Sequence, residues 1–242
     1  MSDAKTGSQL LPKLYSQLPD ATAEYLKQFF LTAPDWIMSS LKLLKLKKDH
    51  IFVREGDSVD TIHLLVLGIV KAIDYRFYGN IYDYMWFYPF TSFGGMEVLL
   101  EQSFYQTTLS TVTPCTILVI PRGLFEQWIN NDIRVLKMEA KVMGTFLLDE
   151  VKRERIFLFM QGSDRLIYTL MHIYEHTASQ KSCIIKLTQQ NLADSTGLSV
   201  KTISRSLREL EQSGYLMRSG NQILISDAQY QQMRSFLREK YE

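Results

Sequence analysis

A basic edge on a short helical pattern is the part of this sequence best suited to chemistry, and that chemistry is contact with nucleic acid. Between Val200 and Arg208 the pattern carries Lys201 and Arg205, with no acidic residue before Glu209. A helix that only packs against its own domain usually mixes its charges, whereas cations and hydroxyls on one face can hold phosphates and base edges. The pattern therefore predicts a helix that presents a basic, hydroxylated edge to duplex DNA.

Helix caps and a glycine turn are spaced so that they position this edge. Thr188 can cap a first helix, Gly197 permits a sharp turn because it lacks a Cβ, and Ser199 can cap a second helix. Apolar residues recur at i, i+4 and i+7 on the second helix and form its inward face: Ile203, Leu207 and Leu210. Gly214 ends that helix, and residues 215–226 predict two strands around a Ser-Gly-Asn turn. The region is predicted to be a winged helix-turn-helix.

The overall composition leaves any nucleic-acid contact to a local patch. The chain has 242 residues, a formal net charge of +1 and 46% hydrophobic residues, as expected of one large or two modest globular domains. Cys115 and Cys183 lie far apart and share no metal-ligand spacing, which favours free thiols. The N-terminal residues do not resemble a signal peptide, and no apolar run reaches the roughly 18 residues that cross a bilayer. We therefore expect a cytoplasmic protein that does not enter a membrane.

Residues 43–120 predict a β-rich unit that follows two short helices, one capped by Asp20 and one starting at Asp35. Turn signals containing Gly separate several short apolar runs: residues 50–53, 61–73, 81–88 and 115–120. Short strands at this spacing indicate an antiparallel sandwich or roll.

Helical periodicity returns after Pro121, first in a short helix and then in a long one that Asp132 can cap and that runs to about Met160. Apolar residues form a seam along the long helix at steps of three and four: Ile133, Leu136, Ala140, Met143, Leu147 and Val151. A helix of nearly thirty residues is roughly 40 Å long, and a small roll cannot cover it. We therefore expect a second copy of the chain to cover this seam in a homodimer.

A break at residues 161–164 separates the long helix from the C-terminal part. Gly162 suits a C-terminal cap of the long helix, and Ser163 or Asp164 can start the next helix. The expected domains are residues 1–122 (N-terminal helices and a sensing roll), 123–162 (dimerisation helix and hinge) and 163–242 (DNA-binding domain).

Three segments resemble the cyclic AMP receptor / fumarate-nitrate regulator (CRP/FNR) family of bacterial transcription factors. They are "FVREGDSVDTIHLLVLGIVK" (52–71), "LFEQWINNDIRVLKMEAKVM" (124–143) and "TISRSLRELEQSGYL" (202–216). The resemblance covers most of the chain and implies an α+β fold. This fold has an N-terminal antiparallel β-roll (a double-stranded β-helix, as in cyclic-nucleotide-binding domains), a long dimerisation helix and a C-terminal winged helix-turn-helix.

The resemblance also assigns DNA-contacting roles. Arg205 occupies the place of an Arg that contacts guanine in the family, and a guanidinium can donate two hydrogen bonds to guanine O6 and N7. Val200 and Lys201 replace the family's usual Arg and Glu, so the operator is expected to differ from the usual half-site. The predicted DNA-contacting residues are Thr188, Gln190, Ser199, Val200, Lys201, Thr202, Ser204, Arg205 and Arg208.

The ligand site departs from the family's pattern. Members that bind cyclic nucleotides hold the phosphate with an Arg and a Ser or Thr, and the ribose with a Glu. Laid without gaps on residues 93–110, the Glu, Arg and Ser places fall on Gly95, Tyr105 and Gln106. A phosphate buried there would have no cation, which is costly. We therefore expect an unidentified small-molecule effector other than cyclic AMP. The cysteine cluster of iron–sulfur members is also missing, and no cofactor is identified.

Aromatic residues are concentrated between Tyr75 and Phe90, and alternation along a strand places about half of them inside the roll. These rings can simply pack the core, some of them against the long helix. Alternatively, they can line a pocket for an apolar or aromatic small molecule. For this alternative the candidate effector pocket is Tyr84, Trp86, Gly94, Gly95, Tyr105, Gln106 and Thr107.

Catalytic and metal-binding patterns are missing from the sequence. His172 and His176 are four residues apart on a predicted helix and could share a metal, but the stretch lacks the Glu of a metallohydrolase. A cupin-like roll enzyme with an appended helical domain would need clustered His and Glu, and the strands offer only His50 and His63. We expect no catalytic residue, no metal site and no enzymatic activity.

The sequence thus predicts a homodimeric DNA-binding transcription regulator. Two recognition helices about 34 Å apart would meet a pseudo-palindromic operator. An effector beside the long helix would rotate the DNA-binding domains about residues 161–164 if it binds the DNA-competent arrangement more tightly. RNA polymerase is a further partner on family resemblance alone. A constitutive regulator controlled by its abundance is the alternative.

Overall fold

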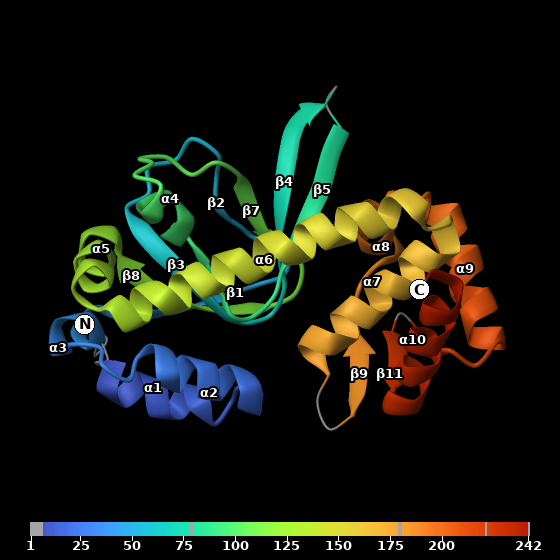
Figure 1. Cartoon of the computed structure of the whole chain (residues 1–242), viewed down its shortest axis with the longest axis horizontal. Helices are drawn as coiled ribbons and strands as arrows, with labels where there is room; N and C mark the ends of the chain where they lie inside the picture. The colour runs from blue at the N-terminus through green and yellow to red at the C-terminus, as the bar shows by residue number, and fades with distance from the viewer. Residues whose placement is uncertain (1–6, 78–79, 179–180, 221, 242) are drawn as a thin grey trace. The chain divides into compact units, whose positions relative to one another are not determined.

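The computed structural model of the chain describes residues 7–77, 80–178, 181–220 and 222–241, apart from the side chains of residues 7, 8, 74–77 and 80–84. The chain forms two compact units (Figure 1). The N-terminal unit comprises residues 1–81 and 85–150, and the C-terminal unit comprises residues 82–84 and 151–242.

The N-terminal unit is built on an antiparallel roll of two four-stranded sheets, as predicted. Strand order is β1-β8-β3-β6 in one sheet and β2-β7-β4-β5 in the other. The strands are β1 (Lys42–Leu46), β2 (Ile51–Val53), β3 (Thr61–Leu67), β4 (Val70–Phe77), β5 (Asn80–Phe87), β6 (Thr91–Phe93), β7 (Thr108–Thr111) and β8 (Cys115–Pro121). The apolar run 61–73 forms two strands because Gly68, with φ +102°, turns the chain beside Cys115, where a Cβ would clash.

In the described part of this unit, five helices precede the long helix: α1 (Gly7–Tyr15), α2 (Asp20–Phe29), α3 (Asp35–Ser40), α4 (Gly95–Leu99) and α5 (Arg122–Asn131). Asp20 does not cap α2, contrary to the prediction, because Pro19 holds the cap position and Asp20 is the first helical residue. Phe29 of α2 is fully buried and packs edge-on against Trp128 of α5, with ring centroids 5.3 Å apart. The N-terminal helices therefore share an aromatic core.

The long helix α6 (Ile133–Phe159) has 27 residues, and its first half lies across the roll in Figure 1. Asp132 caps it as predicted, because its Oδ1 accepts hydrogen bonds from the N–H groups of Arg134 (3.0 Å) and Val135 (3.3 Å). Val135 and Glu139 are buried toward the roll, and Phe146 stacks on Phe87 of β5 at 5.1 Å. These residues define the roll-facing stripe of α6.

The C-terminal unit is a winged helix-turn-helix with additional elements. It contains α7 (Gly162–Thr177), β9 (Ser182–Ile185), α8 (Gln189–Thr196), α9 (Val200–Gln212), β10 (Met217–Ser219), β11 (Gln222–Ser226) and α10 (Asp227–Tyr241). The three strands form one sheet in the order β10-β11-β9. The two wing strands are confirmed, whereas β9 and α10 were not predicted. Gly162 does not end α6, contrary to the prediction, because it is the first residue of α7 behind the N-cap Gln161.

The end of α10 closes over the start of α7. The carboxylate of Asp164 is buried and accepts hydrogen bonds from Lys240 Nζ (2.7 Å) and the Tyr241 hydroxyl. The same hydroxyl accepts a hydrogen bond from the Gln161 N–H (3.3 Å). The residues of the predicted hinge are therefore fastened within the C-terminal unit. No helix in the described part of the chain has the length and apolar character to span a membrane.

Candidate DNA-binding and effector sites

Local hydrogen bonds fix the two helices of the helix-turn-helix. The Thr188 hydroxyl accepts a hydrogen bond from the Asn191 N–H (3.1 Å), and the Asn191 side chain accepts one from the Thr188 N–H (3.2 Å). This reciprocal pair is a capping box. Gly197 then turns the chain with φ +69°, and Ser199 caps α9 by accepting from the Thr202 N–H (3.1 Å). The predicted caps and turn are confirmed.

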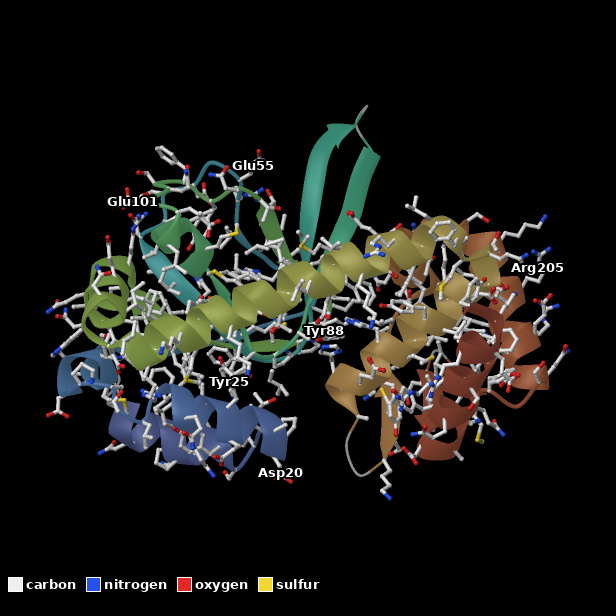
Figure 2. The ribbon with its side chains drawn as sticks, in the orientation of Figure 1. Asp20, Tyr25, Glu55, Tyr88, Glu101 and Arg205 are labelled. Atoms are coloured by element: carbon white, nitrogen blue, oxygen red, sulfur yellow. The ribbon has the colours of Figure 1, made fainter. Side chains whose placement is uncertain are left out.

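The helix α9 separates a buried face from an exposed cationic edge. Its buried residues are Ile203, Ser206, Leu207 and Leu210. Lys201, Arg205 and Arg208 are exposed. The Arg205 side chain is 72% exposed and extends from α9 into solvent (Figure 2), with its Nε 3.8 Å from a Glu209 carboxylate oxygen. An exposed pair at this distance is weak, so Arg205 remains available to a ligand.

The other predicted DNA contacts lie on the same surface to different degrees. Ser199 and Val200 are exposed at the start of α9, and Thr202 and Ser204 are half-buried. Thr188 is exposed, but its hydroxyl already accepts the capping hydrogen bond from the Asn191 N–H. Gln190 is exposed, and its amide donates to Asp194 Oδ1 (2.6 Å). The helix-turn-helix therefore places two of the nine predicted residues, Thr188 and Gln190, at the start of α8 and the other seven along α9 and its cap.

Gly94 and Tyr105 of the candidate effector pocket meet at the same backbone carbonyl. Gly94 starts α4 with φ +92°, and a Cβ there would lie 3.1 Å from the oxygen of Thr61. Tyr105 is buried, and its hydroxyl donates a hydrogen bond to that oxygen. The same hydroxyl lies 3.3 Å from Nδ1 of His63. Burial raises the pKa of Tyr105 to about 12 and lowers the pKa of His63 to about 4. Both groups are therefore neutral near pH 7.

Gly95 marks a contact between the roll and α6 that the sequence did not reveal. A Cβ on Gly95 would collide with the carboxylate of Glu139 and with the Ser92 hydroxyl. Glu139 is fully buried, and its Oε1 accepts a hydrogen bond from Ser92, whereas its Oε2 has no partner among the described residues. Burial raises the pKa of Glu139 to about 7, although the bond from Ser92 acts in the opposite direction. The group therefore changes charge near neutral pH.

The remaining candidate pocket residues are less concentrated. Trp86 is buried, and its indole N–H has no partner among the described residues. Gln106 is exposed and donates its amide to the Phe104 carbonyl (2.8 Å), and Thr107 is half-buried. The side chain of Tyr84 lies outside the described residues. Phe87 and Phe90 pack against other aromatic rings. Phe87 stacks on Phe146 (5.1 Å), and Phe90 lies 4.9 Å from the ring of Tyr25 on α2 (labelled in Figure 2).

A signal for Glu139 exists in the sequence. It follows Val135 by four residues and precedes Phe146 by seven, so it belongs to a second helical stripe. This stripe is offset by one residue, about 100° around the helix, from the predicted dimer seam. A charged residue within an apolar stripe is informative because it must be paired or neutral when buried.

The predicted dimer seam is largely uncovered within one chain. Ile133, Leu147 and Val151 are 64%, 60% and 48% exposed. Ala140 is also exposed, and Leu136 and Met143 are half-buried. Exposed apolar residues that continue along one helix face are typical of a surface that meets another protein.

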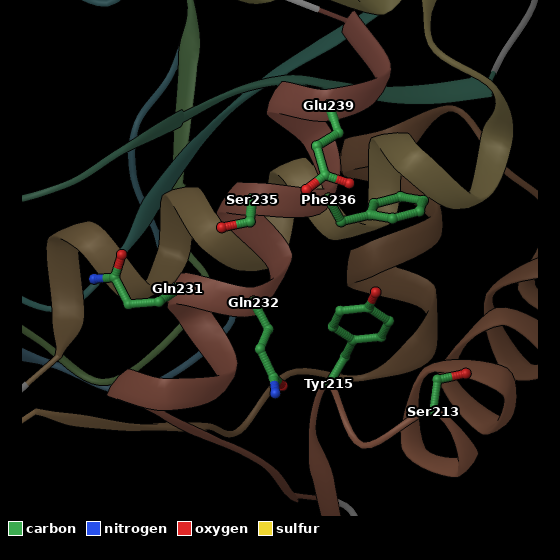
Figure 3. Close-up of a pocket in the computed structure, with 7 residues that line it drawn as sticks. All are labelled: Ser213, Tyr215, Gln231, Gln232, Ser235, Phe236 and Glu239. Atoms are coloured by element: carbon green, nitrogen blue, oxygen red, sulfur yellow. The ribbon is translucent and has the colours of Figure 1, made fainter.

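A groove of about 450 Å³ lies on the C-terminal unit between the end of α9 and α10 (Figure 3). Its walls are mostly polar: Ser213, Tyr215, Gln231, Gln232, Ser235, Phe236 and Glu239. The rings of Tyr215 and Phe236 lie 5.9 Å apart. Ser213 caps the C-terminal end of α9, whereas the predicted base contacts lie near its start. The groove is therefore separate from the predicted DNA-facing edge, which comprises the nine predicted contact residues between Thr188 and Arg208.

The histidines do not assemble a metal site in the described part of the chain. Burial lowers the pKa of His172 to about 3, with a smaller effect of His176, whose ring centroid is 4.3 Å away. His63 packs edge-on against Phe52 at 5.4 Å. No group of three or more potential metal ligands occurs among the described residues.

Comparison with known proteins agrees with this order of parts. A sequence model of the cyclic nucleotide-binding domain matches residues 43–132, and one of the Crp-like helix-turn-helix domain matches residues 164–230. The chain belongs to the CRP/FNR family of transcription regulators. Its matched segments cover the roll and the helix-turn-helix, and most of α10 lies beyond them.

Relatives of this CRP/FNR protein span nearly its whole architecture at low identity. A CRP-like cAMP-activated global transcriptional regulator of Mycobacterium tuberculosis is 20% identical over 201 residues, which cover 80% of this chain and 88% of that protein. The structure of FixK2 from Bradyrhizobium japonicum has a TM-score of 0.69 and 17% identity, and the match covers 80% of this chain and 96% of that chain. The structure of the c-di-GMP responsive regulator CLP of Xanthomonas campestris has a TM-score of 0.62 and 20% identity. The match covers 84% of this chain and 99% of that chain. The predicted fold class is confirmed.

Proposed function

We propose that this CRP/FNR regulator binds a pseudo-palindromic operator as a homodimer, with α9 of each copy in the major groove. The observation that carries the proposal is the exposed edge of Lys201, Arg205 and Arg208 on a helix whose opposite face is buried. Arg205 would donate to guanine O6 and N7, while the hydroxyls and amides at the starts of α8 and α9 would position the phosphates.

The apolar seam of α6 supports the second copy in this proposal. Residues 123–162 would join two chains, residues 1–122 would sense a signal, and residues 163–242 would bind DNA. A helix of 27 residues can bury exposed side chains such as Leu147 and Val151 against its partner over several turns. RNA polymerase is the further partner implied by membership of the family.

A small-molecule effector other than cyclic AMP would act in the roll beside α6. Tyr105 stands at the place of the phosphate-binding Arg and uses its hydroxyl internally, on the Thr61 carbonyl. This position therefore supplies no cation to a cyclic phosphate. An effector would act by binding the DNA-competent arrangement more tightly than the alternative.

Selection of bound duplexes from a random DNA pool tests the DNA-binding proposal. The full chain should recover two inverted half-sites whose centres are about 34 Å apart, one helical turn. The half-site should differ from the family's usual sequence, because Val200 and Lys201 replace the family's usual Arg and Glu at the start of the recognition helix. Recovery of a single unrepeated motif would argue against paired α9 helices, and recovery of no motif with cell extract present would argue against sequence recognition.

A constitutive regulator is the second candidate, and the internal packing of Tyr105 favours it. Gel shifts of the selected duplex with and without small-molecule cell extract distinguish the two. Equal binding in both supports the constitutive regulator, whereas a change on addition of extract supports the sensing regulator.

A further inference from the structure

The buried carboxylate of Glu139 lies where the roll meets α6, and its chemistry indicates which ligands that site can accept. We propose that the roll binds a ligand with a cationic or N–H donor head group, such as an amidine or amine on a flat apolar body, and that Glu139 pairs with this head. The inference rests on the proposed effector site and specifies its ligand class.

The carboxylate is incompletely satisfied in the folded chain. Glu139 Oε1 accepts from Ser92, but Oε2 is buried without a partner, and no described residue forms a salt bridge with the group. A buried carboxylate oxygen without a donor costs free energy that a proton or a ligand donor can recover. Protonation near neutral pH is one way to satisfy it, and a donor head group is the other.

The residues around Glu139 are arranged to admit its carboxylate. Gly95 leaves the space that a Cβ would fill, so the carboxylate of α6 reaches the start of α4. Burial raises the pKa of Tyr25 on α2, and the charge of Glu139 raises it further, but the Tyr25 hydroxyl donates to the Met138 carbonyl (3.3 Å). The hydroxyl of Tyr25 therefore does not satisfy Oε2.

Aromatic rings beside the carboxylate favour a flat apolar body. Phe93 immediately precedes the Gly94-Gly95 pair and packs edge-on against Phe87 (5.1 Å) and Phe52 (5.7 Å). Phe87 in turn stacks on Phe146, two turns along α6 from Glu139. Rings and one charge of fixed sign form the combination that selects an aromatic cation.

The same region rejects anions. Residues 92–107 contain no Lys, Arg or His, and Glu97 within them is buried with Oε1 3.5 Å from the Gln106 backbone nitrogen. An anionic head beside this segment would thus meet the buried carboxyl groups of Glu97 and Glu139 and no cation from residues 92–107. Burial of such a charge without a counter-ion is strongly unfavourable.

Three probes of similar shape and different charge test this inference: benzamidine (cation), benzyl alcohol (neutral) and benzoate (anion). Binding to the full chain at pH 8 is measured by titration calorimetry for wild type, Glu139→Gln, Glu139→Asp and Glu154→Gln. The Gln variant keeps the size of the side chain, and Glu154 is an exposed acid on the same helix. Gel shifts on the same samples report DNA binding separately.

We expect benzamidine to bind wild type and Glu154→Gln equally and Glu139→Gln roughly tenfold or more weakly, since a charge-assisted hydrogen bond is lost. Glu139→Asp should retain the preference for the cation, and benzoate should not bind. Equal affinities of Glu139→Gln and wild type, binding of benzoate, or no benzamidine binding would each overturn the inference. Retained gel shifts in those cases would leave the DNA-binding proposal intact, whereas their loss would count against it.

Discussion

The DNA-facing edge and the Glu139 site differ in how the fold brings their residues together. The edge comes from one run, residues 188–208, and its caps are bonds between residues three apart. The Glu139 site joins β6, the start of α4 and α6, with 47 residues between Ser92 and Glu139. The cations of the edge are exposed to solvent, whereas Glu139 is buried and this burial raises its pKa to about 7.

This difference indicates where each site is vulnerable. A site made from local bonds depends on the stability of its own two helices, and a change in the roll should leave it intact. A site made from distant segments depends on the packing of helix against sheet.

All three tryptophans, Trp36, Trp86 and Trp128, belong to the N-terminal unit, so their fluorescence reports on that unit alone.

The largest expected effect is on the core beneath the DNA-facing edge. Leu207→Ala should destabilise the C-terminal unit by about 2–5 kcal/mol, because it removes a buried side chain of α9. Urea unfolding followed by far-UV circular dichroism should show an early transition, while tryptophan fluorescence should keep its midpoint. Ile184→Ala, at a position 55% exposed on β9, serves as the control. A parallel shift of both signals would mean that the two units do not unfold independently.

The pH dependence of the roll tests the buried carboxylate. The pKa of Glu139 is raised from 4.5 to about 7 on folding, so its stabilising contribution is complete below pH 4.5 and is lost as the pH rises through 7. Relative to Glu139→Gln, wild type should therefore lose up to roughly 3 kcal/mol of unfolding free energy across this range. The measurement is urea unfolding by tryptophan fluorescence from pH 4.5 to 8. Parallel pH curves for the two proteins would contradict the burial of an ionisable Glu139.

Arg205→Ala should weaken binding to the selected operator by about 1–3 kcal/mol and relax one base position, because a bidentate guanine contact is lost. Fluorescence anisotropy with the selected duplex and its single-base variants at fixed salt gives both quantities. Arg155→Ala removes an exposed arginine of α6 and should leave both unchanged. Discrimination equal to wild type in the Arg205 variant would remove this residue from the base contacts.

The smallest expected effect concerns the capping box of α8. Thr188→Ala should cost about 1 kcal/mol of stability in the C-terminal unit, whereas Thr188→Ser keeps the hydroxyl and should cost less. Thermal unfolding by circular dichroism compares the two variants. If the Ser variant is as unstable as the Ala variant, the hydroxyl is not the stabilising group.

Sequence reasoning succeeded where the determinants are local. The caps at Asp132, Thr188 and Ser199 were predictable because one side chain and a nearby N–H define them. The start of α2 was assigned wrongly because Pro19, rather than Asp20, takes the cap position. The start of α7 was assigned wrongly because Gln161, rather than Ser163 or Asp164, takes the cap position and Gly162 is already helical.

The Glu139 site was less predictable because its definition is tertiary. The helical pattern places Glu139 in an apolar stripe with Val135 and Phe146, but its partners Ser92 and Gly95 become known only from the structure. The alignment that placed Tyr105 at the position of an Arg could not tell that the ring turns inward to the Thr61 carbonyl. Side-chain direction in a roll depends on strand register and neighbouring rings, neither of which a single sequence specifies.

The closure of α10 over Asp164 bears on how such regulators diversify. Loss of Lys240 and Tyr241 would leave an enclosed carboxylate with neither its ammonium nor its phenol, at the point where α6 gives way to α7. Because most of α10 lies outside the matched family segment, substitutions there can stiffen or loosen this junction while the predicted DNA-contacting residues stay unchanged. Natural variation in one peripheral helix could thus adjust responsiveness without altering which promoters are recognised.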